Sequence, residues 1–194
     1  MKTAPQQAPA KHKRHKRLVD NDTLVSRDML LHAITAIRHR IKLDCEHDIP
    51  YLAGYSRDGK TIYIDRHLPK FFVCRGKRTP VDRFLILHEA VEKSLLDELG
   101  LHYQHAHQIA LRAEEAAVNA AKVSWREYDK FMQQFIKEAG DEDLTHLPVD
   151  LDIKPYRDEH DRQLLLRMQA AMELKKRELE LGVLPEKGKL GHSH

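Results

Sequence analysis

The sequence predicts a mostly helical α+β domain, in which a small β-hairpin packs on a pair of helices, followed by a long C-terminal helix. Apolar side chains recur every three or four residues through several long stretches, as in helices with one buried face. Between two of these stretches lie two short β-rich runs, residues 51–55 and 61–65, on either side of the turn signal Asp58-Gly59. The pattern therefore favours helices built around one small sheet.

The chain has 194 residues, 41% of them hydrophobic and 32% charged, which suffices for one compact domain with extensions. We expect a basic arm (residues 1–22), an α+β domain (23–140) and a linker (141–156). A charged C-terminal helix (157–182) and a flexible tail (183–194) should follow. No apolar run approaches the ~20 residues that cross a bilayer, and no signal peptide is visible, which predicts a cytoplasmic protein without membrane contact. Cys45 and Cys74 form no C-x-x-C pattern, so two free thiols are expected.

The first 22 residues combine prolines with a run of basic side chains and cannot bury an apolar face, so we expect a disordered arm. Such an arm can contact nucleic acid phosphates without sequence preference. The side chains that would make this contact are Lys11, Lys13, Arg14, Lys16 and Arg17. A solubilising tail explains the same composition equally well, because the net charge of the whole chain is only +3.

The first element after the arm is an amphipathic helix over residues 27–43, with Ser26 as its N-cap and Ile41 in its last turn. In the hairpin that follows, Ile62 and Ile64 should face the core because alternate residues of a strand share a face. A surface position is the preferred interpretation for three further side chains of the hairpin: Tyr55, Tyr63 and Asp65.

Residues 80–99 carry the start and stop signals of a helix. Thr79 suits the N-cap, Pro80 suits the first helical position, and Gly100 provides the C-terminal stop. A second helix must begin almost at once, near Tyr103. Two helices joined so closely should pack against each other.

Three further segments complete the chain. Ser124 and Glu127 form a capping box that opens a helix ending at Gly140, whose aromatic stripe is most simply core. The acidic, proline-punctuated stretch of residues 141–155 reads as a linker or a surface wrap. Residues 157–181 form a charged helix that packs on the domain or pairs with a second copy, giving a homo-oligomer.

A metal-ligating pattern lies on the two central helices. His88 and Glu92 are four residues apart, so both point to one side of a helix and can bind one ion, which Glu89 flanks. The phase of the next helix makes His107 the preferred third ligand, and Glu114 either a fourth ligand or a partner that supports the ligands. Histidine nitrogen and carboxylate oxygen bind zinc at similar distances, so zinc or another divalent metal is the expected cofactor.

Two plainer interpretations compete with a metal site. With 14 histidines and 30 acidic residues, a chance match on a solvated helix face is not rare. The second interpretation is a buried network of ion pairs that holds no metal. The site is favoured because the polar pair emerges from an apolar helix and a second His/Glu pair follows on the next helix. Buried charge without a partner is costly.

At His88-Glu89-Ala90-Val91-Glu92 the chain resembles the zincin-like metallopeptidases and their H-E-x-x-H motif, with Glu92 in place of the second histidine. The resemblance covers roughly residues 50–122. It implies His88 and Glu92 as ligands, Glu89 as general base, and His107 or Glu114 as the third ligand. The run from Tyr55 to Glu114 also resembles uncharacterised proteins of bacteriophages and their bacterial hosts, which implies virion association if the chain is phage-encoded.

The expected function is therefore metal-dependent hydrolysis of a peptide bond in a peptide or protein substrate. One alternative is a noncatalytic phage-type structural or nucleic-acid-associated protein that keeps a metal or a polar cluster for stability. Another is a two-metal carboxylate site between helices, although that arrangement normally draws its ligands from four helices.

Overall fold

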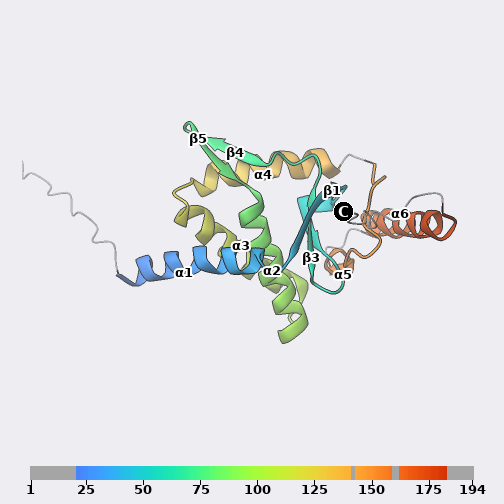
Figure 1. The fold of residues 1–194 in the computed structure, drawn as a ribbon, viewed down its shortest axis with the longest axis horizontal. Coiled ribbons are helices and arrows are strands. Elements are labelled where there is room, and N and C mark those ends of the chain that lie inside the picture. Colours follow the sequence, from blue (N-terminus) through green and yellow to red (C-terminus); the bar gives the residue numbers. More distant parts are fainter. Residues whose placement is uncertain (1–20, 141–142, 159–161, 183–194) are drawn as a thin grey trace, which may run out of the picture.

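The computed structural model describes residues 21–140, 143–158 and 162–182, and it confirms a mixed α+β fold (Figure 1). Its elements in chain order are α1 (Asn21–Arg38), β1 (Lys42–His47), η1 (Pro50–Leu52), β2 (Ala53–Tyr55), β3 (Thr61–Asp65), β4 (Phe71–Cys74), β5 (Lys77–Pro80), α2 (Asp82–Leu99), α3 (Tyr103–Ala120), α4 (Trp125–Gly140), α5 (Lys154–Asp158) and α6 (Arg162–Glu180). Residues 1–20 of the expected basic arm (1–22) and the whole expected tail (183–194) lie outside the described residues. Residues 21–22 belong to helix α1.

The main sheet has three strands in the order β1-β3-β2. The predicted hairpin is confirmed, since β2 pairs antiparallel with β3, and the Asp58 carboxylate accepts hydrogen bonds from Ser56 and Lys60 in the turn. The expected helix over residues 27–43 was wrong at both ends, because α1 already begins at Asn21, which places Ser26 inside the helix rather than at its N-cap. Helix α1 stops at Arg38, and β1 follows in parallel pairing with β3. A helix would satisfy the same backbone groups, so the difference lies in the long-range pairing with β3, which helical periodicity cannot reveal.

A second hairpin, β4–β5, was not predicted, and it displaces the expected start of the next helix. Thr79 and Pro80 belong to β5, where Thr79 pairs with Phe72. Helix α2 therefore begins at Asp82, with Val81 at the N-cap and no side-chain cap. The predicted stop is confirmed, because Gly100 takes the left-handed conformation (φ 60°) and its N–H bonds Leu95.

The two faces of the main sheet contact different parts of the chain. Ile62 and Ile64 lie in the core formed with α2, as predicted. The opposite face is also covered: Tyr63 packs among Leu147, Leu151, Tyr156, Met168 and Met172. The expected surface position of Tyr55, Tyr63 and Asp65 was therefore wrong, since all three are at most 5% exposed.

Helix α4 begins as predicted, with the N–H of Glu127 bonding the Ser124 hydroxyl at 3.4 Å. Its aromatic stripe enters the core, where Tyr128 is fully buried between Phe72 and Phe84. After α4, residues 150–152 lie along β2: the N–H of Asp152 bonds the carbonyl of Tyr55, and the N–H of Arg57 bonds the carbonyl of Asp150.

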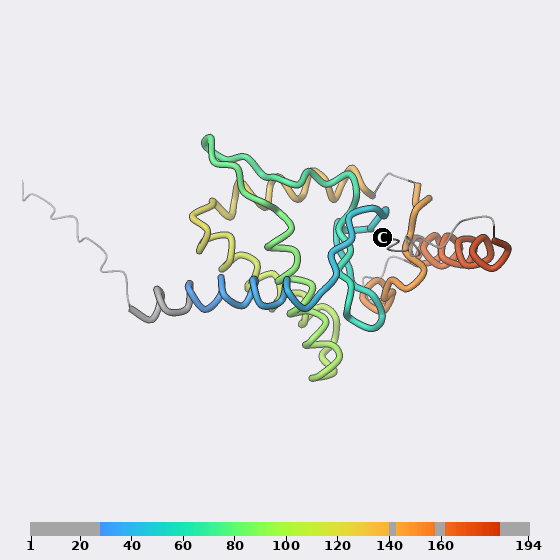
Figure 2. Tube along the Cα trace, viewed as in Figure 1, coloured from blue at the N-terminus to red at the C-terminus, as the bar shows by residue number. Residues whose placement is uncertain are grey.

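The expected long C-terminal helix is confirmed as α6, and the short helix α5 precedes it. Helices α1 and α6 extend toward opposite ends of the molecule (Figure 2). None of the described helices combines the length and the apolar character that crossing a bilayer requires.

Candidate metal centre

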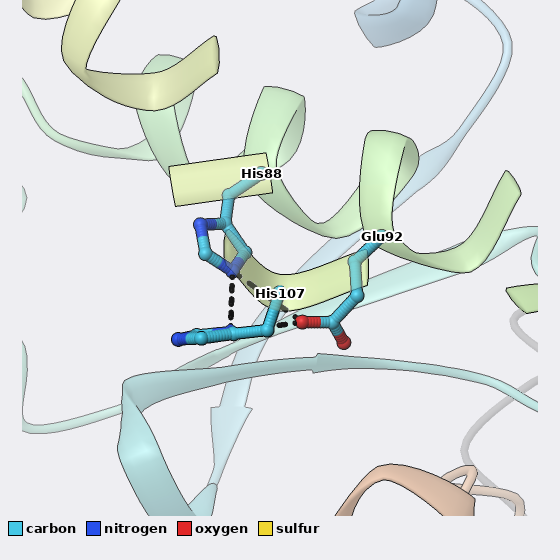
Figure 3. Close-up of side chains that lie close together, drawn as sticks. All are labelled: His88, Glu92 and His107. Atoms are coloured by element: carbon cyan, nitrogen blue, oxygen red, sulfur yellow. Dashed lines mark hydrogen bonds and ion pairs between the residues drawn. The ribbon is translucent and has the colours of Figure 1, made fainter. Parts of the chain in front are cut away.

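The candidate centre lies between α2 and α3. His88 and Glu92 sit one turn apart on the buried side of α2, and His107 lies in the second turn of α3 (Figure 3). The corner between the helices is short because Gly100 ends α2 and the His102 side chain caps α3 by accepting from the N–H of Gln104. This corner brings residues from both helices to one point.

Three side chains converge closely enough to hold one ion. Nε2 of His88 lies 3.2 Å from Nδ1 of His107, which lies 3.0 Å from Oε2 of Glu92. One donor atom from each residue lies within 4.8 Å of the other two. The predicted trio of His88, Glu92 and His107 is therefore brought together. His105, on the same helix, is exposed.

Glu114 lies behind His88 rather than beside the other donors. Its Oε2 is 2.8 Å from Nδ1 of His88, while Nε2 of the same ring faces His107 and Glu92. The second carboxylate oxygen accepts a 2.7 Å hydrogen bond from the Tyr128 hydroxyl. Of the two roles expected for Glu114, this geometry matches the supporting one, in which a carboxylate fixes the orientation and tautomer of a ligating histidine.

Tyrosine hydroxyls surround the centre. Contacts to it from Tyr55 and Tyr128 were not predicted from the sequence. Tyr55 donates to Oε1 of Glu92 at 3.5 Å, and Tyr128 holds Glu114. The Tyr103 hydroxyl lies 3.4 Å from Nδ1 of His107. A usable signal existed for Tyr128, because a phenol on an otherwise apolar helix face needs a polar partner.

Burial and proximity shift the acid-base behaviour of the cluster. Burial disfavours a charged His88, but hydrogen bonds to Glu114 and Glu92 outweigh it and raise the pKa of His88 to about 10. Burial raises the pKa of Glu92, but hydrogen bonds to His107 and His88 outweigh burial and bring this pKa below its ordinary value. A metal ion would have to replace the His88 proton, as metal binding to histidine generally requires.

Glu89 differs from its neighbours in having no partner. It is 7% exposed, and among the described residues none hydrogen-bonds its carboxylate. Burial, followed by the nearby negative charge of Glu92, raises the pKa of Glu89 to about 8. An unpaired carboxylate at this position can exchange a proton with a molecule in the pocket.

The cluster forms the floor of a pocket of about 170 Å³. Its lining includes Glu89 with His88, Glu92 and His107, and aromatic or aliphatic side chains from η1, α4 and α5. Tyr55 and Tyr128 line the same space. A small molecule or a segment of chain could therefore reach the donor atoms.

No protein-family model, curated protein or solved structure matches this chain. What the centre can do follows from its donor atoms. Two imidazole nitrogens and one carboxylate oxygen form a ligand set that suits zinc and other first-row divalent metals, and three protein ligands leave a coordination position open. The residues present therefore fit a divalent metal ion.

Proposed function

We propose that this chain is a metal-dependent hydrolase, with a peptide bond as its substrate and zinc as its metal. The observation that supports the proposal most is the convergence of His88, Glu92 and His107 at the floor of a pocket that also exposes Glu89. Glu114 adds the supporting carboxylate that ligating histidines usually have.

A divalent ion in this position would act as a Lewis acid on a carbonyl oxygen and lower the pKa of a water molecule. The protein would contribute the remaining chemistry. Glu89, whose carboxylate hydrogen-bonds to no other group in the described part of the chain, accepts the proton of the attacking water and passes it to the leaving amine. Tyr103 and Tyr55, whose hydroxyls lie at the ligands, are placed to donate hydrogen bonds to developing negative charge.

The resemblance to zincin-like metallopeptidases supports the same assignment of roles. Glu92 replaces the second histidine of that motif, and mixed histidine and glutamate sets are known among catalytic zinc sites. Oε2 of Glu92 lies 3.0 Å from Nδ1 of His107, and this distance supports Glu92 as a ligand in place of that histidine.

The test is cleavage of a broad peptide library by the purified full-length chain, with and without a chelator. We expect cleavage that zinc restores after chelation. Changing Glu89→Gln keeps the size of the side chain and removes the base, so turnover should fall about 10²- to 10⁴-fold. Bound metal and melting temperature should stay unchanged.

The matched control is Glu98→Gln on the exposed side of the same helix, which should cleave like the parent. The peptidase proposal fails if no peptide is cleaved in a metal-dependent way, or if Glu89→Gln cleaves as fast as the parent.

A noncatalytic role for the cluster is the second candidate, and one observation favours it. His88, Glu92, His107 and Glu114 already hydrogen-bond to one another, so the polar atoms are satisfied without an ion. In that case the cluster acts as a buried polar joint between α2 and α3. Added zinc would then leave the melting temperature unchanged.

A further inference from the structure

The β4–β5 hairpin carries a concentration of positive charge. Residues 66–81 contain five lysines and arginines and no aspartate or glutamate, in a chain whose totals of basic and acidic residues are 33 and 30. Three of these cations, Arg75, Lys77 and Arg78, lie in the turn and in β5, and all three are exposed. None of residues 71–80, all of them described, lines the pocket of the metal centre. The hairpin is therefore a separate surface.

The hairpin is a two-stranded ribbon with one face in the core and the other in solvent. Phe72 and Thr79 are paired and buried, whereas Phe71 and Val73 are 36% and 63% exposed. Among the described strands, β4 and β5 pair only with each other. Their turn projects from the body of the molecule, on the side away from α6 (Figure 1). A large partner can therefore approach the ribbon at its tip and along its outer face.

A fourth cation joins the hairpin from the corner between α3 and α4. Lys122 lines one recess together with Arg75 and Lys77, and the Lys77 ammonium donates to the carbonyl of Ala121 beside it. Within the described part of the chain, the carboxylate that pairs with these cations is Glu127, whose contact to Arg75 is exposed and 3.9 Å long. Exposed ion pairs contribute little, so most of the positive charge is left without a counter-charge. We call these four side chains the hairpin patch: Arg75, Lys77, Arg78 and Lys122.

The outer face of the ribbon distinguishes between two acidic partners, a nucleic acid and a lipid surface. Insertion into lipid tails needs free apolar side chains. The guanidinium of Arg78 lies 3.8 Å from the centroid of the Phe71 ring and covers that face, which leaves Val73, the pairing partner of Arg78, as the free apolar side chain of β4. A narrow cationic ribbon of this kind suits the groove of a duplex better, because the major groove of B-DNA, about 12 Å wide, admits two β-strands.

We propose that the β4–β5 hairpin binds double-stranded DNA, with the hairpin patch against the phosphate backbone. Phosphate contacts position a protein but carry no sequence information, so the binding has no sequence preference. Each phosphate that a cation neutralises releases counterions, and affinity therefore falls steeply as salt rises. This activity is additional to the proposed hydrolysis and independent of it, since the hairpin patch and the pocket share no residue.

The chain offers a matched pair of charge reversals to test the proposal, because a Lys-Arg dipeptide occurs both in the hairpin and in α6. Lys77→Glu with Arg78→Glu alters the hairpin patch. Lys176→Glu with Arg177→Glu makes the same change of charge at two exposed positions of α6. Fluorescence anisotropy of a short labelled DNA duplex, titrated with full-length protein at several salt concentrations, measures affinity and its salt dependence.

The hairpin reversal should weaken binding at least about tenfold and reduce the slope of log affinity against log salt by about 2, one for each lost phosphate contact. The α6 reversal should leave both quantities unchanged, because salt screens charges that lie far from the DNA. Residues 1–22 are the same in every variant, so any binding by the basic arm cancels in this comparison.

A milder variant keeps the test valid if the hairpin reversal fails to fold. The Arg75 side chain is 83% exposed at the turn and contacts only the exposed Glu127 among the described carboxylates, so Arg75→Gln should fold and reduce the slope by about 1. Absence of DNA binding by the parent at low salt, equal effects of the two reversals, or an unchanged slope for Arg75→Gln would overturn the proposal. Binding of the parent to anionic lipid vesicles but not to DNA would also overturn it.

Discussion

The described residues include a buried polar cluster beside the main sheet and another between α2 and α3, and the two are built differently. The sheet cluster consists of Asp48, which follows β1, and of Asp65 and Arg66 at the end of β3. Its carboxylates accept mainly from backbone N–H groups: Ile49 and His67 bond Asp65, and His146 bonds Asp48 at 2.7 Å. Arg66 pairs with Asp48 at 2.6 Å.

The helix-pair cluster consists of His88, Glu92, His107 and Glu114. Its carboxylates contact ring nitrogens and tyrosine hydroxyls, all of them side-chain groups. The sheet cluster joins loops, whereas the helix-pair cluster joins two helices and lines the same pocket as Glu89. A carboxylate that accepts from backbone N–H groups serves to stabilise the fold. A carboxylate that contacts imidazoles and phenols can exchange its partner for a proton or a metal ion.

The largest stability effect should come from the sheet cluster. Changing Asp48→Ala leaves Arg66 without its anion and the N–H of His146 without its acceptor, so the free energy of unfolding should fall by about 2–3 kcal/mol. Urea unfolding with and without a chelator measures it. The loss should be the same in both conditions, and a loss that depends on metal would erase the distinction between the clusters.

A smaller effect is expected from the supporting carboxylate of the helix-pair cluster. Changing Glu114→Gln weakens the hold on Nδ1 of His88, and zinc affinity should fall about 10- to 100-fold, or about 1.4–2.7 kcal/mol. Competition with a coloured chelator measures the affinity. Glu115→Gln is the control on the same helix, and equal affinities for the two variants would remove the supporting role.

The smallest effect concerns Asp44 in β1. Like the carboxylates of the sheet cluster, it accepts a hydrogen bond from a backbone N–H, that of Glu46. Burial raises its pKa, but hydrogen bonds from the N–H of Glu46 and from His47 outweigh burial and bring the pKa below the ordinary value. The resulting stability is present above about pH 4 and is lost as pH falls through the folded pKa, so it should not exceed about 1 kcal/mol. Asp44→Asn should flatten the acid limb of a pH-stability curve, and an unchanged limb would contradict the assignment.

The three ligand positions could be predicted from sequence because they depend on helix phase alone. A spacing of four residues places His88 and Glu92 together, and the short corner at Gly100 requires the next helix to fold back near them. The start of α2 could not be predicted, because Thr79 and Pro80 satisfy helix rules locally while their strand partners lie in β4.

Tyr63 escaped prediction for a similar reason. The β2–β3 hairpin reads as a surface element until the face that carries Tyr63 is covered by side chains that follow about a hundred positions later, among them Leu151 and Met168. Long-range packing of this kind leaves no periodic signal in the hairpin itself. The pocket wall contributed by Tyr156 was hidden in the same way.

The most direct test of the metal centre is elemental analysis of full-length protein purified without a metal-affinity step. We predict close to one zinc or other divalent ion per chain, lost on changing His107→Ala and retained on changing His105→Ala, because only His107 reaches His88 and Glu92. A parent protein that contains no metal and binds no added zinc, or a His107→Ala variant that keeps its ion, would contradict a metal centre at these residues.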